Sequence, residues 1–331
     1  MYVLKKISPG LLLTLIIASI SRFLSGLLPI HLIGAGVIAL FLGMLLNPWA
    51  SQREGLYPGI TFTGKKVLRL AIIFMGISLS LPQVLKVGRF SLIVMVFTLF
   101  AAFFGGYLLG RLLGLDWKLS GLISSGTGIC GGSAIAAVAP VIGAKDQFIA
   151  YAISATFVFD VFMVVLFPLM GEALGLSDLG FGLWTGTAIN DTSSVVAAGY
   201  AYSEAAGDFA VIVKLTRTLA IIPVVLIFSM IGKKHRSQKA SLHISEIFPW
   251  FILGFLALVG LNSTGWIPPS LSGFFSGMGR FFMIMALGAI GLRTNFKELS
   301  KSGIKPLIHG ITISTLVVVV SLVVQYFLGS L

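Results

Sequence analysis

Apolar residues fill most of the chain in long stretches that short polar segments separate. Crossing the hydrocarbon core of a bilayer takes roughly 17 to 25 helical residues, and stretches of this size predict about eleven transmembrane helices with no room for a soluble domain. We expect residues 1–331 to form one integral membrane domain of all-α class. The expected spans cover residues 11–29, 31–46, 67–81, 90–113, 119–143, 148–170, 181–202, 209–231, 247–261, 272–292 and 306–328.

One of these spans contains a stretch with too many glycines and hydroxyls for an ordinary helix. Residues 125–140 read S-G-T-G-I-C-G-G-S-A-I-A-A-V-A-P. Each glycine weakens a helix by about 1 kcal/mol relative to alanine. Unwound backbone persists in a membrane only where it lines a polar cavity or is buried in protein. The stretch therefore predicts a discontinuous transporter helix, whose broken ends present amide dipoles to a substrate or a coupling ion.

A second copy of this stretch follows at residues 185–198, which read T-G-T-A-I-N-D-T-S-S-V-V-A-A. A shift of about sixty residues aligns Gly126, Thr127, Ile129 and Ser133 with Gly186, Thr187, Ile189 and Ser193. Small residues at such positions also allow two helices to pack closely. Packing alone does not require Asn190 and Asp191 inside a span, so the pair favours a second discontinuous helix.

The composition is that of a membrane protein. The chain is 57% hydrophobic and 10% charged, with a formal net charge of +12. Most basic residues lie in short loops and are not interleaved with aromatic residues, which argues against nucleic-acid binding. Apart from Lys86 and Arg89, they fall on one side if the spans alternate. The positive-inside rule then predicts a multi-pass protein of the bacterial cell (inner) membrane with a cytoplasmic N-terminus.

Four ionisable residues lie well inside predicted spans: Asp160, Asp191, Lys214 and Arg217. Each costs roughly 2.5 to 3.5 kcal/mol at the centre of a helix on insertion scales, so each requires a partner or a watery cavity. A structural salt bridge is one interpretation. The other is an electropositive pocket, in which Lys214 and Arg217 bind an anion while Asp191 carries a proton or balances charge. We expect Asp160 to be a packing or gating residue, with a proton relay as the alternative.

Catalysis has no support in the sequence. The four histidines lie at predicted helix ends or in a loop, away from the serine-rich stretches, so no Ser-His-Asp arrangement is indicated. The single cysteine, Cys130, has no Cys or His cluster around it that would hold a metal. No ATP-binding motif is present. We therefore expect a protein that is not an enzyme, has no cofactor and holds no metal.

Four motifs together resemble one family. S-G-T-G-I-C-G-G-S, G-T-A-I-N-D-T-S-S, V-I-V-K-L-T-R and G-A-I-G-L-R-T-N-F are similar to those of the YeiH-type bacterial inner-membrane proteins, commonly labelled sulfate exporters. The resemblance implies an architecture like that of sodium/proton antiporters and bile-acid-type sodium symporters, with inverted repeats, crossed broken helices and two subdomains that move against each other. It also implies a homodimer. Many relatives carry I-H-E where this chain has Ile189, Asn190 and Asp191.

The leading hypothesis is a secondary active transporter of a small anion, such as sulfate or an organic sulfonate or carboxylate. Alternating access would be driven by a proton or sodium gradient across the lipid bilayer. The candidate substrate-binding residues are Ser125, Thr127, Gly128, Gly131, Gly132, Ser133, Thr187, Asn190, Asp191, Ser193, Lys214 and Arg217. The first alternative is a monovalent cation/proton antiporter in which Asp191, with or without Asp160, binds the ion and Lys214 competes as a counter-charge. A non-transporting membrane scaffold or sensor is the second.

Overall fold

The computed structural model describes residues 2–27, 35–233, 250–293 and 303–329, and all regular structure within these ranges is helical. Every expected span has a helical counterpart, which confirms the all-α fold. Six described helices are long and apolar enough to cross a membrane. The basic loop around residues 234–239, which contributed to the predicted topology, lies outside the described residues.

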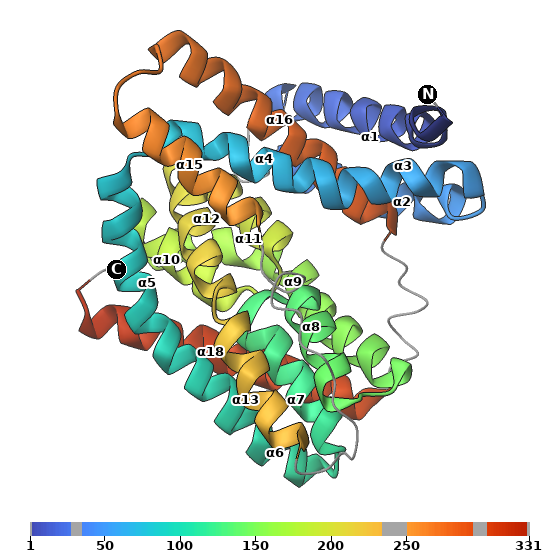
Figure 1. Cartoon of the computed structure of the whole chain (residues 1–331), viewed down its shortest axis with the longest axis vertical. Coiled ribbons are helices and arrows are strands. Elements are labelled where there is room, and N and C mark those ends of the chain that lie inside the picture. The colour runs from blue at the N-terminus through green and yellow to red at the C-terminus, as the bar shows by residue number, and fades with distance from the viewer. Residues whose placement is uncertain (1, 28–34, 234–249, 294–302, 330–331) are drawn as a thin grey trace. The chain divides into compact units, whose positions relative to one another are not determined.

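Only a few residues separate most consecutive helices along the chain (Figure 1). In chain order they are α1 (Tyr2–Leu27), α2 (Ala35–Ala50), η1 (Glu54–Leu56), α3 (Tyr57–Phe62), η2 (Thr63–Val67), α4 (Leu68–Met75), η3 (Gly76–Ser78), α5 (Leu81–Phe100), η4 (Ala101–Gly105), α6 (Gly106–Leu113), α7 (Trp117–Ser125), η5 (Gly126–Cys130), α8 (Gly132–Ile142), α9 (Asp146–Ala173), α10 (Asp178–Ala188), α11 (Thr192–Tyr202), α12 (Glu204–Thr218), α13 (Ile221–Lys233), α15 (Phe251–Ser263), α16 (Pro269–Arg293) and α18 (Ile304–Phe327).

The chain divides into two compact units. Unit 1 comprises residues 1–86, 197–208 and 250–296, and unit 2 comprises residues 87–196, 209–249 and 297–331. Helices α11 and α12 each have residues in both units. Since the broken helices and the buried charges between residues 117 and 217 belong almost entirely to unit 2, this unit holds the candidate site.

In unit 1, α16 packs along α2 and α4, and α1 packs against α2 and α3 (Figure 1). Two close backbone approaches fix these contacts. A Cβ on Gly43 would lie 2.4 Å from the Gly288 carbonyl oxygen, and one on Gly59 would lie 2.1 Å from the Ile7 carbonyl oxygen. Lipid is as apolar as the side chains, so this close packing, rather than a hydrophobic driving force, stabilises the helix contacts.

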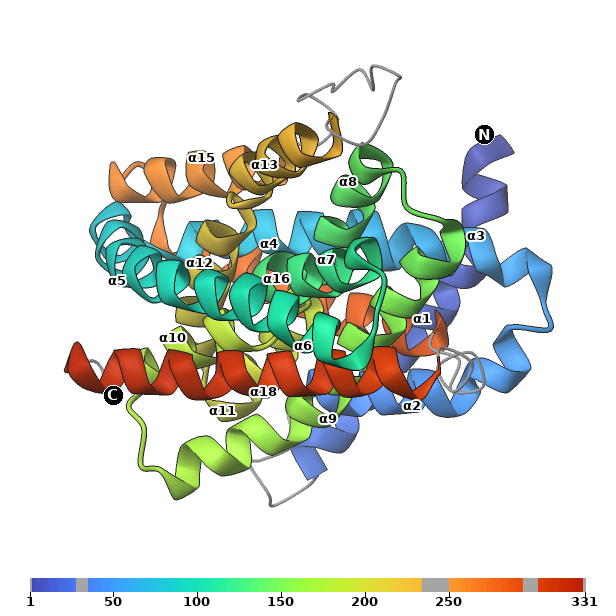
Figure 2. The ribbon, with the colours of Figure 1, turned by 90° about the horizontal axis from the view of Figure 1, so that it is seen from below.

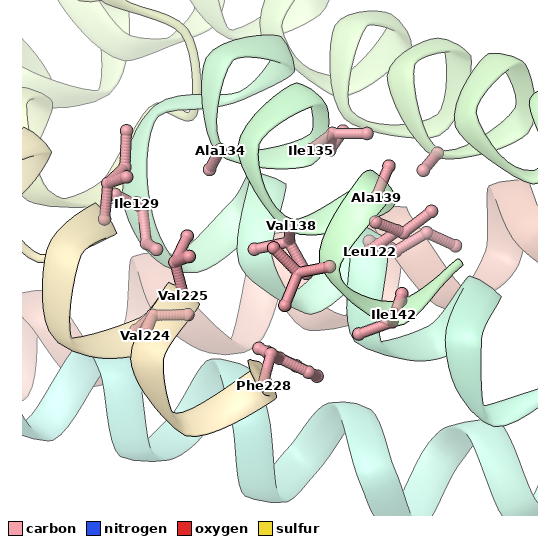
Figure 3. Packing of buried hydrophobic residues seen from close by; sticks show 14 of the residues in the cluster. Leu122, Ile129, Ala134, Ile135, Val138, Ala139, Ile142, Val224, Val225 and Phe228 are labelled. Carbon is pink, nitrogen blue, oxygen red and sulfur yellow. The ribbon is translucent and has the colours of Figure 1, made fainter. Parts of the chain in front are cut away.

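In unit 2, a cluster of buried aliphatic residues joins α7, α8, α9 and α13. Figure 3 shows Leu122 of α7 and Val138 of α8 packed near Phe228 of α13. The cluster includes Ala134 and Ile135 in the first turn of α8 and Ile142 at its last residue, so it packs along the whole helix. It therefore fixes the position of α8 directly after the first break.

Helix α18 is the other support of the site in unit 2. It contacts α7, α9 and α10, and it runs beside η4 and α6, as Figure 2 shows. One face carries buried polar residues, which are His309, Ser314, Ser321 and Gln325. An apolar span with such a face must offer these groups partners in neighbouring helices, and some of those partners come from the broken helices.

Candidate functional site

The first break lies between α7 and α8. The five residues of η5 form a π-turn, closed by a 2.8 Å hydrogen bond from the Gly131 amide to the Gly126 carbonyl. Only Gly131 leaves the helical conformation, with φ +61° and ψ −131°, which a residue with a side chain rarely adopts. The predicted discontinuous helix is confirmed. Its break is narrower than the glycine pattern suggested, because Gly126 and Gly128 stay in the π-turn and Gly132 opens α8.

The second break lies between α10 and α11. Helix α10 ends at Ala188, Ile189 is extended with φ −75° and ψ 140°, and α11 begins at Thr192. Asn190 and Asp191 therefore form the break itself, as their polarity inside a span indicated. The alignment of the two stretches places Asp191 at the position of Gly131, directly before the second half of each helix.

Lys214 covers carbonyl groups of both breaks. Its ammonium group donates to the carbonyl oxygen of Ile129 at 2.9 Å, to that of Ile189 at 3.0 Å, and to that of Asn190. The side chain is fully buried. An ammonium group has three donors, so these three carbonyls use all of them. Because Ile129 and Ile189 are aligned residues, the ammonium group binds the carbonyl oxygen of the same position in each break.

Arg217 does the same one turn further along α12. Its Nε donates to the carbonyl oxygen of Gly128 at 2.7 Å, its Nη1 to that of Ile189 at 3.3 Å, and its Nη2 to that of Thr127. The C-terminal end of a helix carries a partial negative charge, which a cation stabilises. The two cations thus neutralise the carbonyl ends of α7–η5 and α10.

These contacts bear on two of the predictions made from the sequence. Over the described residues, no carboxylate oxygen lies within 4.0 Å of the Lys214 or Arg217 head groups, so neither forms the structural salt bridge that was one interpretation. The other interpretation gave both head groups to an anion. The hydrogen bonds found for them go to backbone carbonyls instead: Lys214 uses all three of its donors in this way, and Arg217 uses three of its five.

Carboxylates cover the amide end of α11. Asp160 accepts from the Asn190 amide at 2.9 Å with Oδ1 and from the Asp191 amide at 2.8 Å with Oδ2. Asp191 accepts with Oδ2 from the Ser193 amide at 2.9 Å and from the Ser193 hydroxyl. Negative charge at a helix N-terminus is stabilising. Asp160 is therefore part of the second break. The sequence did not reveal this role, because a single acidic residue in an apolar span does not indicate which helix its side chain contacts.

The amide end of α8 has no such cover. Gly131 offers no side chain at the position of Asp191, and the amides of Gly132 and Ser133 have no hydrogen-bond acceptor in the described part of the chain. The next amide, that of Ala134, faces the buried Cys130 thiol. Gly132 is half-buried and Ser133 is exposed, so both amides lie near the surface of the structure.

The Asp191 side chain lies directly beside this uncovered end. A Cβ on Gly131 would be 3.3 Å from the Asp191 Cα and Cβ atoms and 3.4 Å from its Oδ1. Asp191 is half-buried, whereas Asp160 is 1% exposed. The half-buried carboxylate of Asp191 and the uncovered N-terminus of α8 therefore lie next to each other.

Hydroxyl groups of α18 contact both breaks. The Thr127 and Ser314 hydroxyl oxygens lie 3.3 Å apart, and those of Thr187 and Ser321 lie 2.5 Å apart. Asn190 donates with Nδ2 to Ser314 at 3.1 Å. The sequence gave no signal for the α18 serines, since isolated serines are common in spans. Ser125, in contrast, donates to the Gly121 carbonyl of its own helix at 2.7 Å, and so its hydroxyl is not directed to the breaks.

Asn190 is fully buried, and its amide is incompletely paired. Nδ2 also approaches the Thr156 carbonyl oxygen at 3.4 Å, but Oδ1 has no partner. Exchanging the two amide atoms would leave the nitrogen unpaired instead. Buried polar atoms rarely lack a partner, so a water molecule or a ligand is expected beside Asn190.

Comparison with known proteins gives consistent relatives. The family described as conserved hypothetical protein 698 matches residues 9–310. A UPF0324 membrane protein from Clostridium tetani is 61% identical over 99% of both chains, and one from Streptococcus pneumoniae is 41% identical over 98% of both. Another, from Streptococcus agalactiae, is 42% identical over 97% of this chain and 98% of its own length.

A solved structure of the sodium proton antiporter MjNhaP1 from Methanocaldococcus jannaschii covers 100% of this chain and 98% of its own. It is 15% identical with a TM-score of 0.30, which is too low to support an argument about fold or activity. The resemblance to the YeiH-type family is confirmed by the sequence relatives alone. From the extent of these matches, this multi-pass membrane protein belongs to the family of conserved hypothetical protein 698, the UPF0324 membrane proteins.

Proposed function

We propose that this protein is a secondary active transporter that moves a small anion across the bacterial inner membrane by alternating access about its two broken helices. A proton or sodium gradient supplies the driving force. In this proposal the N-terminus is cytoplasmic, the protein works in the lipid bilayer as a homodimer, and it neither catalyses a reaction nor binds nucleic acid. No cofactor or resident metal takes part.

The uncovered N-terminus of α8 carries the proposal. Three of the four helix ends at the breaks are covered by side chains of opposite charge, namely Lys214, Arg217, Asp160 and Asp191. The fourth end has two amides without a protein acceptor. An α-helix N-terminus attracts anions through its free amides and its dipole. The Asn190 side chain of the adjacent break, beside Thr156 and Ser314, also has an unpaired amide atom, so a water molecule or a ligand is expected there.

The chemistry of this end favours a small oxyanion. The Gly132 and Ser133 amides and the Ser133 hydroxyl can donate to neighbouring oxygens of a sulfate, sulfonate or carboxylate group. Lys214 and Arg217 add positive potential near the breaks, although all three donors of Lys214 and three of the five donors of Arg217 already bind carbonyls.

The half-buried Asp191 carboxylate favours a second candidate, a monovalent cation/proton antiporter that binds its ion there. Removing charge from Lys214 or Arg217 does not separate the two functions, since either change uncovers buried carbonyls and destabilises the fold in both. A test must act on the amides of α8 or on Asp191. A scaffold or sensor, the third alternative, predicts no flux under any gradient.

Gly132→Pro tests the anion function with little disturbance of the helix. Proline is tolerated in the first turn, where it removes only an amide that makes no helical hydrogen bond. Gly132→Ala is the matched control, because it retains the amide and its Cβ meets no atom within 4 Å. Thermal stability of the detergent-purified proteins would be measured with sulfate, sulfite, thiosulfate, taurine, acetate, sodium and lithium.

We expect one anion to stabilise the wild type and Gly132→Ala, and to stabilise Gly132→Pro at about tenfold higher concentration, as the loss of a charge-assisted hydrogen bond predicts. Stabilisation by sodium or lithium alone, unchanged in Gly132→Pro, would contradict the anion function and favour the antiporter.

A further inference from the structure

The positions of the two carboxylates indicate which ion is coupled to the anion. This inference rests on the proposed function. We propose that Asp191 carries a proton that moves together with the anion, so that the site holds either a bare Asp191 carboxylate or the anion beside a protonated Asp191.

Asp191 lies at the same place as the uncovered amides of α8. Asp191 lies against Gly131, with its Oδ1 3.4 Å from the position of a Gly131 Cβ, and Gly131 directly precedes the uncovered amides of α8. An anion on the Gly132 and Ser133 amides would therefore lie close to this carboxylate. Two negative groups at one helix end repel each other, and a proton on one of them removes the repulsion.

Of the four carboxylate oxygens of Asp160 and Asp191, Asp191 Oδ1 is the one that can take the proton. Asp160 uses both of its oxygens to accept backbone amides, from Asn190 and Asp191. Asp191 uses Oδ2 to accept from the Ser193 amide and hydroxyl. Asp191 Oδ1 is the one oxygen of the two acids for which the described residues provide no hydrogen-bond donor. A proton bound there breaks none of the contacts that form the second break.

The charges buried around the second break balance one another. Asp160 of α9, Lys214 of α12 and the Cys130 thiol of η5 lie near Asp191, and Arg217 of α12 lies near Asp160 and Cys130. Two cations and two carboxylates sum to zero. An anion alone would leave one unbalanced negative charge at membrane depth, which is costly. An anion that arrives with a proton keeps the balance, so the loaded and the empty site are both neutral when the anion is monovalent.

The transport cycle then contains one proton transfer and no change in the anion. As the anion binds the α8 amides, a proton from water binds Asp191 Oδ1. On the other side of the membrane the anion leaves, the proton returns to water, and Asp191 is again the carboxylate that faces α8. A monovalent anion moves without net charge in this cycle.

Proton uptake on binding tests the proposal directly. Purified protein in weakly buffered detergent solution near pH 7 would receive acetate, methanesulfonate or sulfate at the same pH. Thermal stability reports binding, and a pH-sensitive dye reports the protons taken up. The variants are Asp191→Asn and Asp191→Glu, with Asp146→Asn as the control, since Asp146 is an exposed acid of unit 2 away from the breaks.

We expect about one proton per bound anion in the wild type, Asp146→Asn and Asp191→Glu, and none in Asp191→Asn, which still binds the anion. Apparent affinity in the wild type should fall about tenfold for each pH unit over which one proton is taken up with the anion, as linkage to one proton requires, and should not change with pH in Asp191→Asn. If Asp191→Asn does not fold, the pH dependence of the apparent anion affinity in the wild type and in Asp191→Glu is the measurement that tests the proposal.

Anion binding without proton uptake in the wild type would overturn the proton proposal and leave the anion function intact; binding that requires sodium would do the same. No stabilisation by any of the three anions, together with none in the wider panel above, would overturn both.

Discussion

The two broken helices are alike at their carbonyl ends and different at their amide ends. Lys214 binds the aligned carbonyls of Ile129 and Ile189 at nearly equal distances, 2.9 and 3.0 Å. At the amide ends, α11 is covered by Asp160 and Asp191, whereas α8 begins after Gly131 and has no carboxylate of its own. The shared carbonyl ends have a structural role, and the unshared amide end of α8 is where we propose that the anion binds. Part of the difference comes from one aligned pair, Gly131 and Asp191, and part from Asp160 of α9.

Lys214→Met should have the largest effect, because it removes the part that the two breaks share. Three buried carbonyls lose their donor, and the two carboxylates lose a balancing charge, for a loss of about 3–5 kcal/mol in the free energy of unfolding. Unfolding of the detergent-purified protein by denaturant would measure it. Lys86→Met, at an exposed lysine, is the control. Equal stability of the two variants would contradict the structural role of Lys214.

Asp160→Ala should remove half of the difference between the breaks. It uncovers the Asn190 and Asp191 amides, and the loss of two hydrogen bonds to a charged group predicts about 2–4 kcal/mol. The anion should still bind, because the α8 amides are unchanged. The same unfolding experiment and the anion panel would measure both effects; complete loss of anion binding in a folded Asp160→Ala protein would argue that α11 also holds the anion.

Gly131→Ala tests the conformation that separates the two halves of the first helix. A side chain at φ +61° and ψ −131° is strained, and its Cβ would lie 3.3 Å from Asp191, so we expect a loss of about 1–3 kcal/mol. Gly132→Ala, one residue on, should be close to neutral. A ranking of the two variants in the opposite order would show that the break has a different conformation.

The smallest expected effects concern the α18 hydroxyls. Ser321→Ala removes a 2.5 Å contact to Thr187, and Ser314→Ala removes a 3.3 Å contact to Thr127 and the acceptor of Asn190. Each should cost about 0.5–1.5 kcal/mol in the same unfolding measurement. Only Ser314→Ala should also alter anion affinity, since it frees the Asn190 amide; an equal change in affinity for both variants would count against a role for Asn190.

The sequence predicted most of the fold. Apolar length placed the spans, and glycine density together with Asn190 and Asp191 placed the two breaks. The alignment that paired Ile129 with Ile189 proved to have a physical meaning, because both carbonyls accept from Lys214.

The pairing of charges could not be predicted from the sequence. A buried lysine or arginine can bind an anion, a carboxylate or a backbone carbonyl, and residue type does not decide between them. The structure directs Lys214 and Arg217 to carbonyls, and Asp160 to amides thirty residues further on. Serines such as Ser314 and Ser321 are too common in membrane helices to be recognised before their neighbours are known.

The cover of the carbonyl ends by α12 has a consequence for how the protein is made. A ribosome releases α7, η5, α8 and α10 before it has synthesised Lys214 and Arg217, and α18 follows later in the chain. Until then, the carbonyl groups at the breaks lack the donors of Lys214 and Arg217, and unpaired carbonyl groups are costly in hydrocarbon. These segments therefore cannot settle at their final depth in the order of synthesis. They can reach their final depth in the membrane only after α12 has been synthesised and its two cations bind these carbonyl groups.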